Sequence, residues 1–357
     1  MRIVYVVGTR PNFVKTAPVI AALRSRLPEG RHAIVHTGQH YDRMMSEVFL
    51  EELNVPAPDY LLEVGSGSHA QQTAWVMERL EPVLEDEQPD LVMVPGDVNS
   101  TLAAALTAAK MQIPVAHIES GLRSFDRTMP EEINRIVADE FSEYLFLHSD
   151  EAIENLRAEG IPDERMHFVG NTMIDTLVAL EDRFRSAGAA AGLDVEPGSF
   201  VLVTLHRPAL VDGPLLAETM AQLVSLAHEM PVVFPVHPRT RKMMEEAEPD
   251  HLGLLLCEPL GYVDFLSLLA DARAALTDSG GIQEETAYLG VPCFTLRDNT
   301  ERPVTIRAGT NRLLGLDPAA IAGIPGALAE PQGDHQGPPP LWDGHAAERV
   351  ADVLAGD

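Results

Sequence analysis

The sequence contains few cysteines and little basic charge. Two of its 357 residues are cysteines, and Cys257 and Cys293 both lie in apolar surroundings, where a small buried hydrophobe is expected rather than a redox centre. This pattern suits a reducing, cytoplasmic setting. Lys and Arg total 26 against 54 Asp and Glu, a formal net charge of −28 at pH 7. Because nucleic acids and anionic membranes would be repelled, we expect neither as a partner.

Long hydrophobic runs are also missing. The longest, such as 3–7 and 91–94, end well short of the roughly 20 residues that a membrane span needs. The sequence therefore predicts no segment that crosses a bilayer, and no small-residue cleavage pattern of a secretory leader follows Arg2. The length and the 45% hydrophobic content suit two domains with a core each.

What the chain does have is an alternation of short β-branched runs and amphipathic helical stretches. Strands are expected at RIVYVV, HAIVH, DLVMV, PVAHI and YLFLH, and this βαβ rhythm predicts a parallel sheet with helices on both faces. One predicted helix follows the cap Ser68, and its core face is expected at three- and four-residue steps. These positions are Ala70, Ala74, Met77, Leu80 and Leu84.

A second cycle of strands follows at FVLVTL, VVFPVH, GLLLC, RAALTD and PCFTL. The sequence therefore predicts an α/β protein of two Rossmann-like, doubly wound parallel-sheet domains, residues 1–170 and 171–343. A helix over 172–185 should lead into the Ala/Gly-rich stretch 186–198, which we interpret as a flexible connector. A final helix, 344–357, is expected to return to the first domain.

Ligands of open parallel sheets bind beyond the carboxyl ends of the strands. The first strand runs into GTRPNFVK, where a helix N-terminus with Arg10 and Lys15 favours phosphate; a solvent-facing Arg10 is the alternative. No G-x-G-x-x-G follows any strand, so the fingerprint of NAD-dependent enzymes is missing.

Three acidic residues follow strands of the first domain or begin a helix nearby. Asp97, Glu119 and Glu131 are expected at the mouth of one sheet, and carboxylates in such places are costly unless paired or used. The alternative is that Asp97 caps the helix starting near Asn99 while Glu131 only decorates a first helical turn. Taken together, the three indicate a catalytic cluster.

The second domain offers imidazoles and a glycine-containing turn. His206 and His237 each follow a strand, and a structural role is the alternative for His237. In TDSGGIQEE, the backbone N–H groups of Ser279, Gly280 and Gly281 can cradle a pyrophosphate, and Glu285 is placed to accept from ribose hydroxyls. Asp278 could instead simply cap this helix.

These motifs together resemble the non-hydrolysing UDP-N-acetylglucosamine 2-epimerases. The resemblance runs nearly end to end, through GTRPNFVKTAP, TGQHYD, GDVNSTLAAALTAAK, PVAHIESGLRSFDRTMPEEINR, VGNTMIDTL, VTLHRP, PVHPRT, LTDSGGIQEE and LGVPCFTLRDNTERP. It implies a GT-B-type architecture, with the two domains facing a central cleft, and a homodimer.

The resemblance also implies roles for individual residues. Its catalytic positions fall on Asp97, Glu119, Glu131 and His206, and its UDP-holding positions on Arg10, Ser279, Gly280 and Glu285. Further substrate contacts are expected from charged or small residues of the same motifs: Lys15, Arg135, His237, Gly281 and Arg302.

The implied reaction inverts carbon 2 of UDP-N-acetylglucosamine with neither cofactor nor metal. Carbon 2 has no adjacent carbonyl, so its proton is too weakly acidic for a carboxylate alone, and the missing dinucleotide fingerprint argues against oxidation by NAD. Expulsion of UDP gives 2-acetamidoglucal, and readdition with protonation from the other face inverts the centre. UDP-N-acetylglucosamine or UDP is therefore the expected ligand.

Three departures from the family pattern bear on specificity. Where relatives read Q-H-x-Q near a second, activating substrate site, this chain has Gln39 and Asp42, and no arginine lies near Gly65. HRxEN is replaced by HRPAL, and TERPE ends in Val304. A modified UDP-acetamido sugar, a GT-B-type glycosyltransferase, a hydrolysing epimerase and a non-catalytic nucleotide-sugar-binding protein remain alternatives.

Overall fold

Both halves of the chain fold into parallel sheets with helices on either side, as the alternation of strands and helices predicts. The structure is a computed structural model, and it describes residues 1–38, 50–236, 238–247, 253–330 and 337–356. Contacts divide the chain into an N-terminal unit, Met1–Ala179 with Pro340–Asp357, and a C-terminal unit, Leu180–Pro339. The predicted class, α/β with two Rossmann-like parallel-sheet domains, is confirmed.

The described part of the N-terminal unit holds a seven-stranded sheet of order β3-β2-β1-β4-β5-β6-β7. Every pairing is parallel. The direction of winding reverses between β1 and β4, which is the switch point where Rossmann-type sheets bind ligands. The strands are β1 (Arg2–Val7), β2 (Arg31–His36), β3 (Tyr60–Leu61), β4 (Leu91–Pro95), β5 (Val115–Ile118), β6 (Tyr144–Leu147) and β7 (Met166–Phe168).

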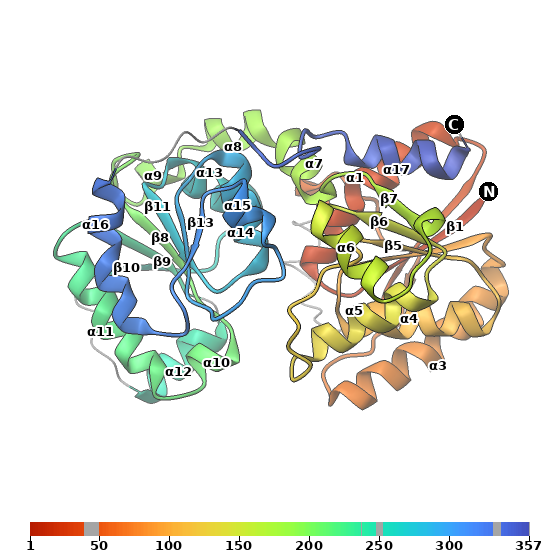
Figure 1. Ribbon diagram of the computed structural model, residues 1–357, viewed down its shortest axis with the longest axis horizontal. Coiled ribbons are helices and arrows are strands. Elements are labelled where there is room, and N and C mark those ends of the chain that lie inside the picture. The colour runs from red at the N-terminus through yellow and green to blue at the C-terminus, as the bar shows by residue number, and fades with distance from the viewer. Residues whose placement is uncertain (39–49, 237, 248–252, 331–336, 357) are drawn as a thin grey trace. The chain divides into compact units, whose positions relative to one another are not determined.

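Helices cover both faces of this sheet. Figure 1 shows α3, α4 and α5 along one face and α1, α7 and α17 along the other. Alternate residues of β1 and β4, such as Val4, Val6 and Val94, pack under the first group. The helices are α1 (Arg10–Arg26), α3 (His69–Glu87), α4 (Asn99–Lys110), α5 (Pro130–Phe141), α6 (Asp150–Ala158), α7 (Thr172–Ala179) and α17 (Ala346–Ala355).

Helix α3 forms behind Ser68 as predicted, but its buried face differs. The Ser68 hydroxyl accepts a hydrogen bond from the Gln71 N–H at 3.3 Å, whereas Ala70 and Ala74 are exposed. The buried residues are Gln72, Val76, Leu80 and Leu84. Alanine buries too little apolar surface to set the orientation of a helix, so the larger side chains decide the phase.

The segment expected to separate the domains belongs partly to each unit. The predicted helix over 172–185 is broken at Leu180 into α7 and α8 (Glu181–Ala187). Helix α7 packs on α1, where the Thr176 hydroxyl donates to the Val14 carbonyl at 2.6 Å, so the division falls after Ala179 rather than at Gly170. The stretch interpreted as a connector contains α9 (Ala189–Gly192), whose Ala190 is buried.

The C-terminal unit repeats the same winding. Its described residues form a six-stranded sheet of order β10-β9-β8-β11-β12-β13, again parallel throughout. The switch point lies between β8 and β11. The strands are β8 (Val201–Thr204), β9 (Val232–Pro235), β10 (Leu255–Cys257), β11 (Ala274–Thr277), β12 (Cys293–Thr295) and β13 (Asn311–Leu313).

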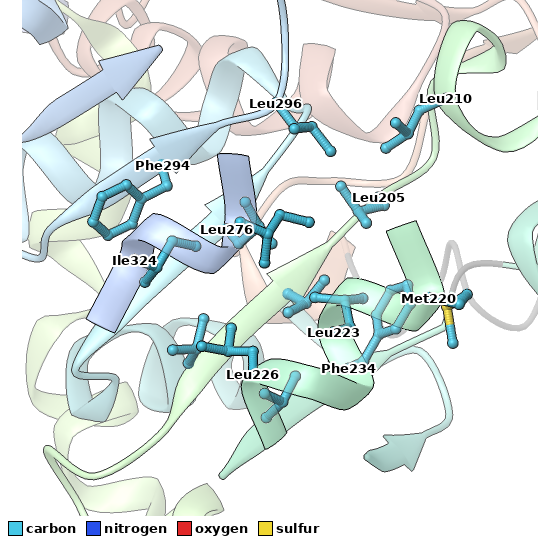
Figure 2. Packing of buried hydrophobic residues seen from close by; sticks show 14 of the residues in the cluster. Leu205, Leu210, Met220, Leu223, Leu226, Phe234, Leu276, Phe294, Leu296 and Ile324 are labelled. Carbon is cyan, nitrogen blue, oxygen red and sulfur yellow. The ribbon is translucent and has the colours of Figure 1, made fainter. Parts of the chain in front are cut away.

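One apolar core lies between this sheet and the helices on one of its faces. Figure 2 shows Phe234, Leu276 and Phe294 from the strands meeting Leu223 and Ile324 from the helices. The helices of the unit, besides α8 and α9, are α10 (Pro208–Val211), α11 (Leu215–Ala227), α12 (Pro238–Ala247), α13 (Tyr262–Asp271), α14 (Gly280–Leu289), α15 (Val304–Arg307) and α16 (Ile324–Ala329).

The last helix of the chain packs within the N-terminal unit. Helix α17 lies against α1 and α7, and the Asp175 carboxylate accepts from the N–H groups of Ala346 and Ala347 at 3.1 and 2.6 Å. Before it, the buried Trp342 donates its indole N–H to the His148 carbonyl at 2.8 Å. In the part of the chain that the structure describes, no helix has the length and apolarity of a membrane span.

Candidate active site

The carboxyl ends of β4 and β5 bring two acidic residues to neighbouring positions in the N-terminal unit. Pro95 at the end of β4 pairs with Ile118 at the end of β5, and Asp97 and Glu119 follow directly. Because parallel strands end at the same edge of a sheet, both residues lie at the switch-point edge, where a ligand is expected.

Asp97 is held by an arginine and does not cap a helix. The Arg135 guanidinium lies 2.8 and 3.0 Å from its Oδ2, while the N-cap of α4 is Val98. Arg135 also donates to Glu132 Oε2 at 2.5 Å. Glu132, which the sequence interpretation missed, accepts from the Ser124 and Phe125 N–H groups at 2.9 Å. It thereby anchors the 119–129 loop. Glu132 could have been predicted from the sequence because it lies one helical turn before Arg135.

Glu119 forms a buried ion pair with Lys15. The Lys15 ammonium donates to Glu119 Oε2, and the two residues are 8% and 7% exposed. Glu119 also has a φ of 66°, in the left-handed region that costs a non-glycine residue roughly 1 kcal/mol or more. Such strain persists only where the surroundings impose it, and it gathers at functional sites.

Arg10 and Glu131 lie in the first turns of helices. Arg10 is the first residue of α1 and is half-buried. The loop before it is held by Asn12, whose Oδ1 accepts from the N–H groups of Gly8 and Thr9 at 3.0 and 3.1 Å. Glu131 is half-buried in the first turn of α5, where the helix dipole favours a carboxylate.

In the C-terminal unit, an aspartate joins the ends of β8 and β11. Asp278 Oδ2 accepts from the N–H groups of His206 and Arg207 at 2.9 and 2.7 Å, and its Oδ1 lies 3.0 Å from His206 Nδ1. Burial raises the pKa of Asp278, but the bonds from His206 and the two amides outweigh it and lower the pKa below its usual value. Asp278 is therefore not a helix cap; Ser279 is the N-cap of α14.

The start of α14 has the features of an anion site. The side chain of Ser279 makes no capping bond to the first turn, so the N–H groups of Gly280 and Gly281 are left for other acceptors. A Cβ on Gly280 would lie 2.4 Å from an Arg302 nitrogen, so only glycine lets this guanidinium approach the helix. Arg302 is 6% exposed and pairs with Glu284 at 2.8 Å.

Glu285 lies one turn further along α14 and is buried. Tyr262 donates its hydroxyl to Glu285 Oε1 at 2.9 Å. Burial raises the pKa of Glu285 to about 8, and the neighbouring Glu284 adds to the effect, while the bond from Tyr262 opposes it. Sequence reasoning missed Tyr262, which is 23 residues away in the chain.

Two of the residues that depart from the family pattern are buried apolar side chains. Leu210 is 1% exposed and contributes to the core of the C-terminal unit (Figure 2), and Val304 is 3% exposed at the start of α15. His237, Gln39 and Asp42 lie outside the described residues.

The structure thus groups Asp97 with Arg135, Glu119 with Lys15, and His206 with the Asp278–Ser279 turn. Fold and site define an α/β protein with charged residues at the switch points of two Rossmann-type sheets.

Comparison with known proteins specifies the family. The family model described as UDP-N-acetylglucosamine 2-epimerase matches residues 24–355. A UDP-N-acetylglucosamine 2-epimerase of Methanococcus maripaludis is 39% identical, over 99% of this chain and 98% of that protein. A UDP-2,3-diacetamido-2,3-dideoxy-D-glucuronate 2-epimerase of Pseudomonas aeruginosa is 42% identical, over 88% of each.

Solved structures agree. The Methanocaldococcus jannaschii UDP-GlcNAc 2-epimerase, in complex with UDP-GlcNAc and UDP, superposes with a TM-score of 0.90 at 39% identity over 100% of both chains. This chain belongs to the UDP-N-acetylglucosamine 2-epimerase family, whose members are isomerases.

Proposed function

We propose that this protein reversibly converts UDP-N-acetylglucosamine to UDP-N-acetylmannosamine by eliminating and re-adding UDP. The observation that carries the proposal is that Asp97 and Glu119 end neighbouring strands, each held by a buried cation, in a chain of the epimerase family. A carboxylate fixed in this way keeps one position and one set of hydrogen bonds, as proton transfer at a defined carbon requires.

In the first half of the reaction, a carboxylate removes the proton from carbon 2. The electron pair of the C2–H bond forms the C1=C2 bond, and the C1–O bond breaks with its pair going to UDP. The products are 2-acetamidoglucal, UDP and a protonated carboxyl group. We assign this proton transfer jointly to Asp97, Glu119 and Glu131.

In the second half, a different carboxyl group protonates carbon 2 from the opposite face. The UDP oxygen then bonds to carbon 1, which restores the sugar nucleotide with an inverted centre. Base and acid must therefore come from different places, and Asp97 on the β4 loop, Glu119 after β5 and Glu131 on α5 satisfy this requirement. Lys15 and Arg135 hold two of these carboxylates, and we assign them further contacts with the substrate.

The leaving group needs stabilisation of its developing charge. We assign this role to Arg10, His206, Arg302 and the N–H groups at Ser279, Gly280 and Gly281, since helix N-termini and guanidinium groups favour phosphate. Glu285 would accept from the ribose hydroxyls, and His237 completes the predicted contacts.

The test is exchange of the carbon 2 hydrogen with solvent. Purified protein incubated with UDP-N-acetylglucosamine in heavy water should place deuterium at carbon 2 of both epimers, with no acceptor present. Asp97→Asn removes one charge without changing shape, and we expect a loss of about 10²-fold or more. Glu85→Gln, on an exposed position of α3, is the matched control.

Each rival has its own signature in this experiment. With a glycosyltransferase or a non-catalytic binding protein, carbon 2 would keep its original hydrogen and gain no deuterium. A hydrolysing epimerase would release free N-acetylmannosamine. Unchanged exchange in Asp97→Asn would remove Asp97 from the mechanism.

A modified UDP-acetamido sugar is a second candidate substrate. The 42% identity to the P. aeruginosa diacetamido-glucuronate epimerase favours it, as do Ala209 and Val304, which stand where the family pattern has carboxylates. The ratio of kcat/KM for the two sugar nucleotides decides between them.

We also propose that the enzyme is a cytoplasmic homodimer, as the family resemblance implies. Exposed apolar side chains on and before α5, namely Phe125, Ile133 and Phe141, support a protein partner. The free thiols of Cys257 and Cys293 suit a reducing compartment. Light scattering after size-exclusion chromatography would show a mass of about 39 kDa for a monomer and twice that for the dimer.

A further inference from the structure

A chain of four charged side chains lies behind the Asp97 turn, and the proposed mechanism does not use it. His117 on β5 contacts Asp139 on α5, Asp139 contacts Arg123, and Arg123 contacts Glu159. The side chains of His117 and Asp139 are 0% exposed, and that of Arg123 is 1% exposed. Buried charges are costly unless they are paired, so their arrangement must be nearly self-neutralising.

Both ring nitrogens of His117 face groups that accept hydrogen bonds. Nδ1 lies 2.7 Å from Asp139 Oδ1, and Nε2 lies 2.7 Å from the Gly96 carbonyl oxygen. A carbonyl oxygen can only accept, and an ionised carboxylate can only accept. A neutral imidazole has a single N–H, so it would leave one of these contacts without a proton.

The hydrogen-bond donors around Asp139 indicate that its carboxyl group is ionised. Its Oδ2 accepts from the Gly121 N–H at 3.1 Å and lies 2.7 Å from an Arg123 nitrogen. The Arg123 guanidinium stabilises the ionised form of this carboxyl group. The oxygen facing His117 therefore carries no proton to donate.

The surrounding charges can accommodate a cationic His117. Arg123 lies 2.6 Å from Glu159 as well as 2.7 Å from Asp139, so one arginine faces two carboxylates. A doubly protonated His117 makes the charges alternate along the row, which ends at the solvent-exposed Glu159. The other charged groups at this edge are paired as well: Lys15 with Glu119, and Arg135 with Asp97 and Glu132.

We propose that His117 is a permanently protonated positioning residue that sets the backbone from which Asp97 acts. Its Nε2–H holds the Gly96 carbonyl, and the Gly96 N–H donates to the Ile118 carbonyl at 3.0 Å. Gly96 has a φ of +65°, so the chain turns here and delivers the next residue, Asp97, to Arg135. His117 also lies two residues before the strained Glu119. The catalytic consequence rests on the proposed function; the protonation state does not.

The protonation state can be measured without activity. Heteronuclear NMR of protein labelled with 15N-histidine, compared with His117→Gln to assign the ring, should show both nitrogens of His117 protonated at about pH 8, where an ordinary imidazole is neutral. Asp139→Asn should remove this signature, because the amide cannot balance the charge. A neutral His117 tautomer at that pH overturns the proposal.

The positioning role is tested by kinetics on the same variants. His117→Gln should lower kcat for carbon 2 exchange about 100-fold, since small displacements of a reacting group cost rates of that order. KM and the affinity for UDP should stay within about twofold of wild type, because the ring holds only the Asp97 turn. His228→Gln, at the exposed C-cap of α11 in the other unit, is the control.

Circular dichroism and the melting temperature show whether each variant folds; if His117→Gln does not, Asp139→Asn and the wild-type spectrum still decide. A folded His117→Gln with wild-type kcat overturns the positioning role. If the wild-type protein shows no exchange at carbon 2, the proposed function is refuted instead. The protonation state of His117 is then still decided by the NMR measurement.

Discussion

At the scale of single residues, the acidic side chains of the site fall into two groups. Asp97 and Glu119 have cationic partners, Arg135 and Lys15. Glu285 has instead the Tyr262 hydroxyl and a carboxylate neighbour, and its pKa is raised to about 8 by burial. The first two therefore each face a cation, whereas Glu285 holds its proton near neutral pH until something stabilises its charge.

This difference predicts proton-linked nucleotide binding. If Glu285 accepts from the ribose hydroxyls, UDP favours its ionised form, and binding releases a proton below about pH 8. The affinity for UDP should therefore rise with pH between about 7 and 8 and level off above, in a range where the phosphates are already ionised. Isothermal titration calorimetry in buffers of different ionisation enthalpy measures the released proton.

Glu285→Gln cannot ionise, so its affinity should be weaker and independent of pH over the same range. Equal proton release by the wild type and by this variant would show that another group is responsible.

At the scale of elements, α17 is held at its N-terminus by one buried carboxyl group. Asp175 accepts from two N–H groups of α17, which favours its ionised form, as does the helix dipole. Burial is nevertheless the larger effect and raises the pKa to about 6, from an ordinary value of 3.8. The native protein therefore holds the Asp175 proton more tightly than the unfolded chain does.

The sign of the pH dependence follows from linkage. Between about pH 4 and pH 6 the unfolded chain loses this proton first, so the Asp175 contribution to stability falls as the pH rises through that window. The full change is on the order of 3 kcal/mol. Urea unfolding of wild type and Asp175→Asn across these pH values should differ by this slope, because the amide does not titrate.

Asp352→Asn is the matched control for this helix. Asp352 also lies on α17, but it is 53% exposed in a surface ion pair with Arg26, which contributes little. A pH slope in Asp175→Asn equal to that of wild type would contradict the prediction.

At the scale of the whole molecule, the dominant property is acidity. A net charge of −28 destabilises the folded state by self-repulsion, while the ion pairs of the site are buried and screened far less than surface charges. Added salt should therefore weaken the repulsion among the surface carboxylates more than it weakens the attraction within the buried ion pairs. We expect the melting temperature to rise by several degrees between about 0.01 and 1 M sodium chloride, where the screening length shortens from about 30 to 3 Å.

Differential scanning fluorimetry measures this rise. Chloride is the appropriate anion, because sulfate would add stabilisation by exclusion from the surface. A melting temperature that falls with sodium chloride would mean that attractive surface pairs outweigh the self-repulsion.

The local elements were largely predictable. Strands such as RIVYVV and the helix behind Ser68 follow from β-branched runs and apolar periodicity, which depend on near neighbours. The strands β3, β7 and β13 were missed; each has only two or three residues, too few to show a periodic signal. Ala70 and Ala74 were assigned to the wrong face because small side chains constrain a helix weakly.

The residues at the strand ends could also be named from the sequence, since strand carboxyl ends are where ligands bind in parallel sheets. Their partners could not. Lys15 and Glu119 are 104 residues apart, and Asp278 reaches the amides of His206 and Arg207 across 72 and 71 residues. Such pairings depend on strand order, which no local pattern encodes.

By itself, then, the sequence determined the two parallel-sheet domains, the charged residues at their strand ends and, through its motifs, the family. Only the tertiary structure decided which cation holds which carboxylate, that Asp278 joins two strands instead of capping a helix, and that His117 stands between Asp139 and the Gly96 carbonyl. The reason is physical: secondary structure follows from interactions a few residues apart, whereas the state of a buried charge is set by whatever the fold places beside it.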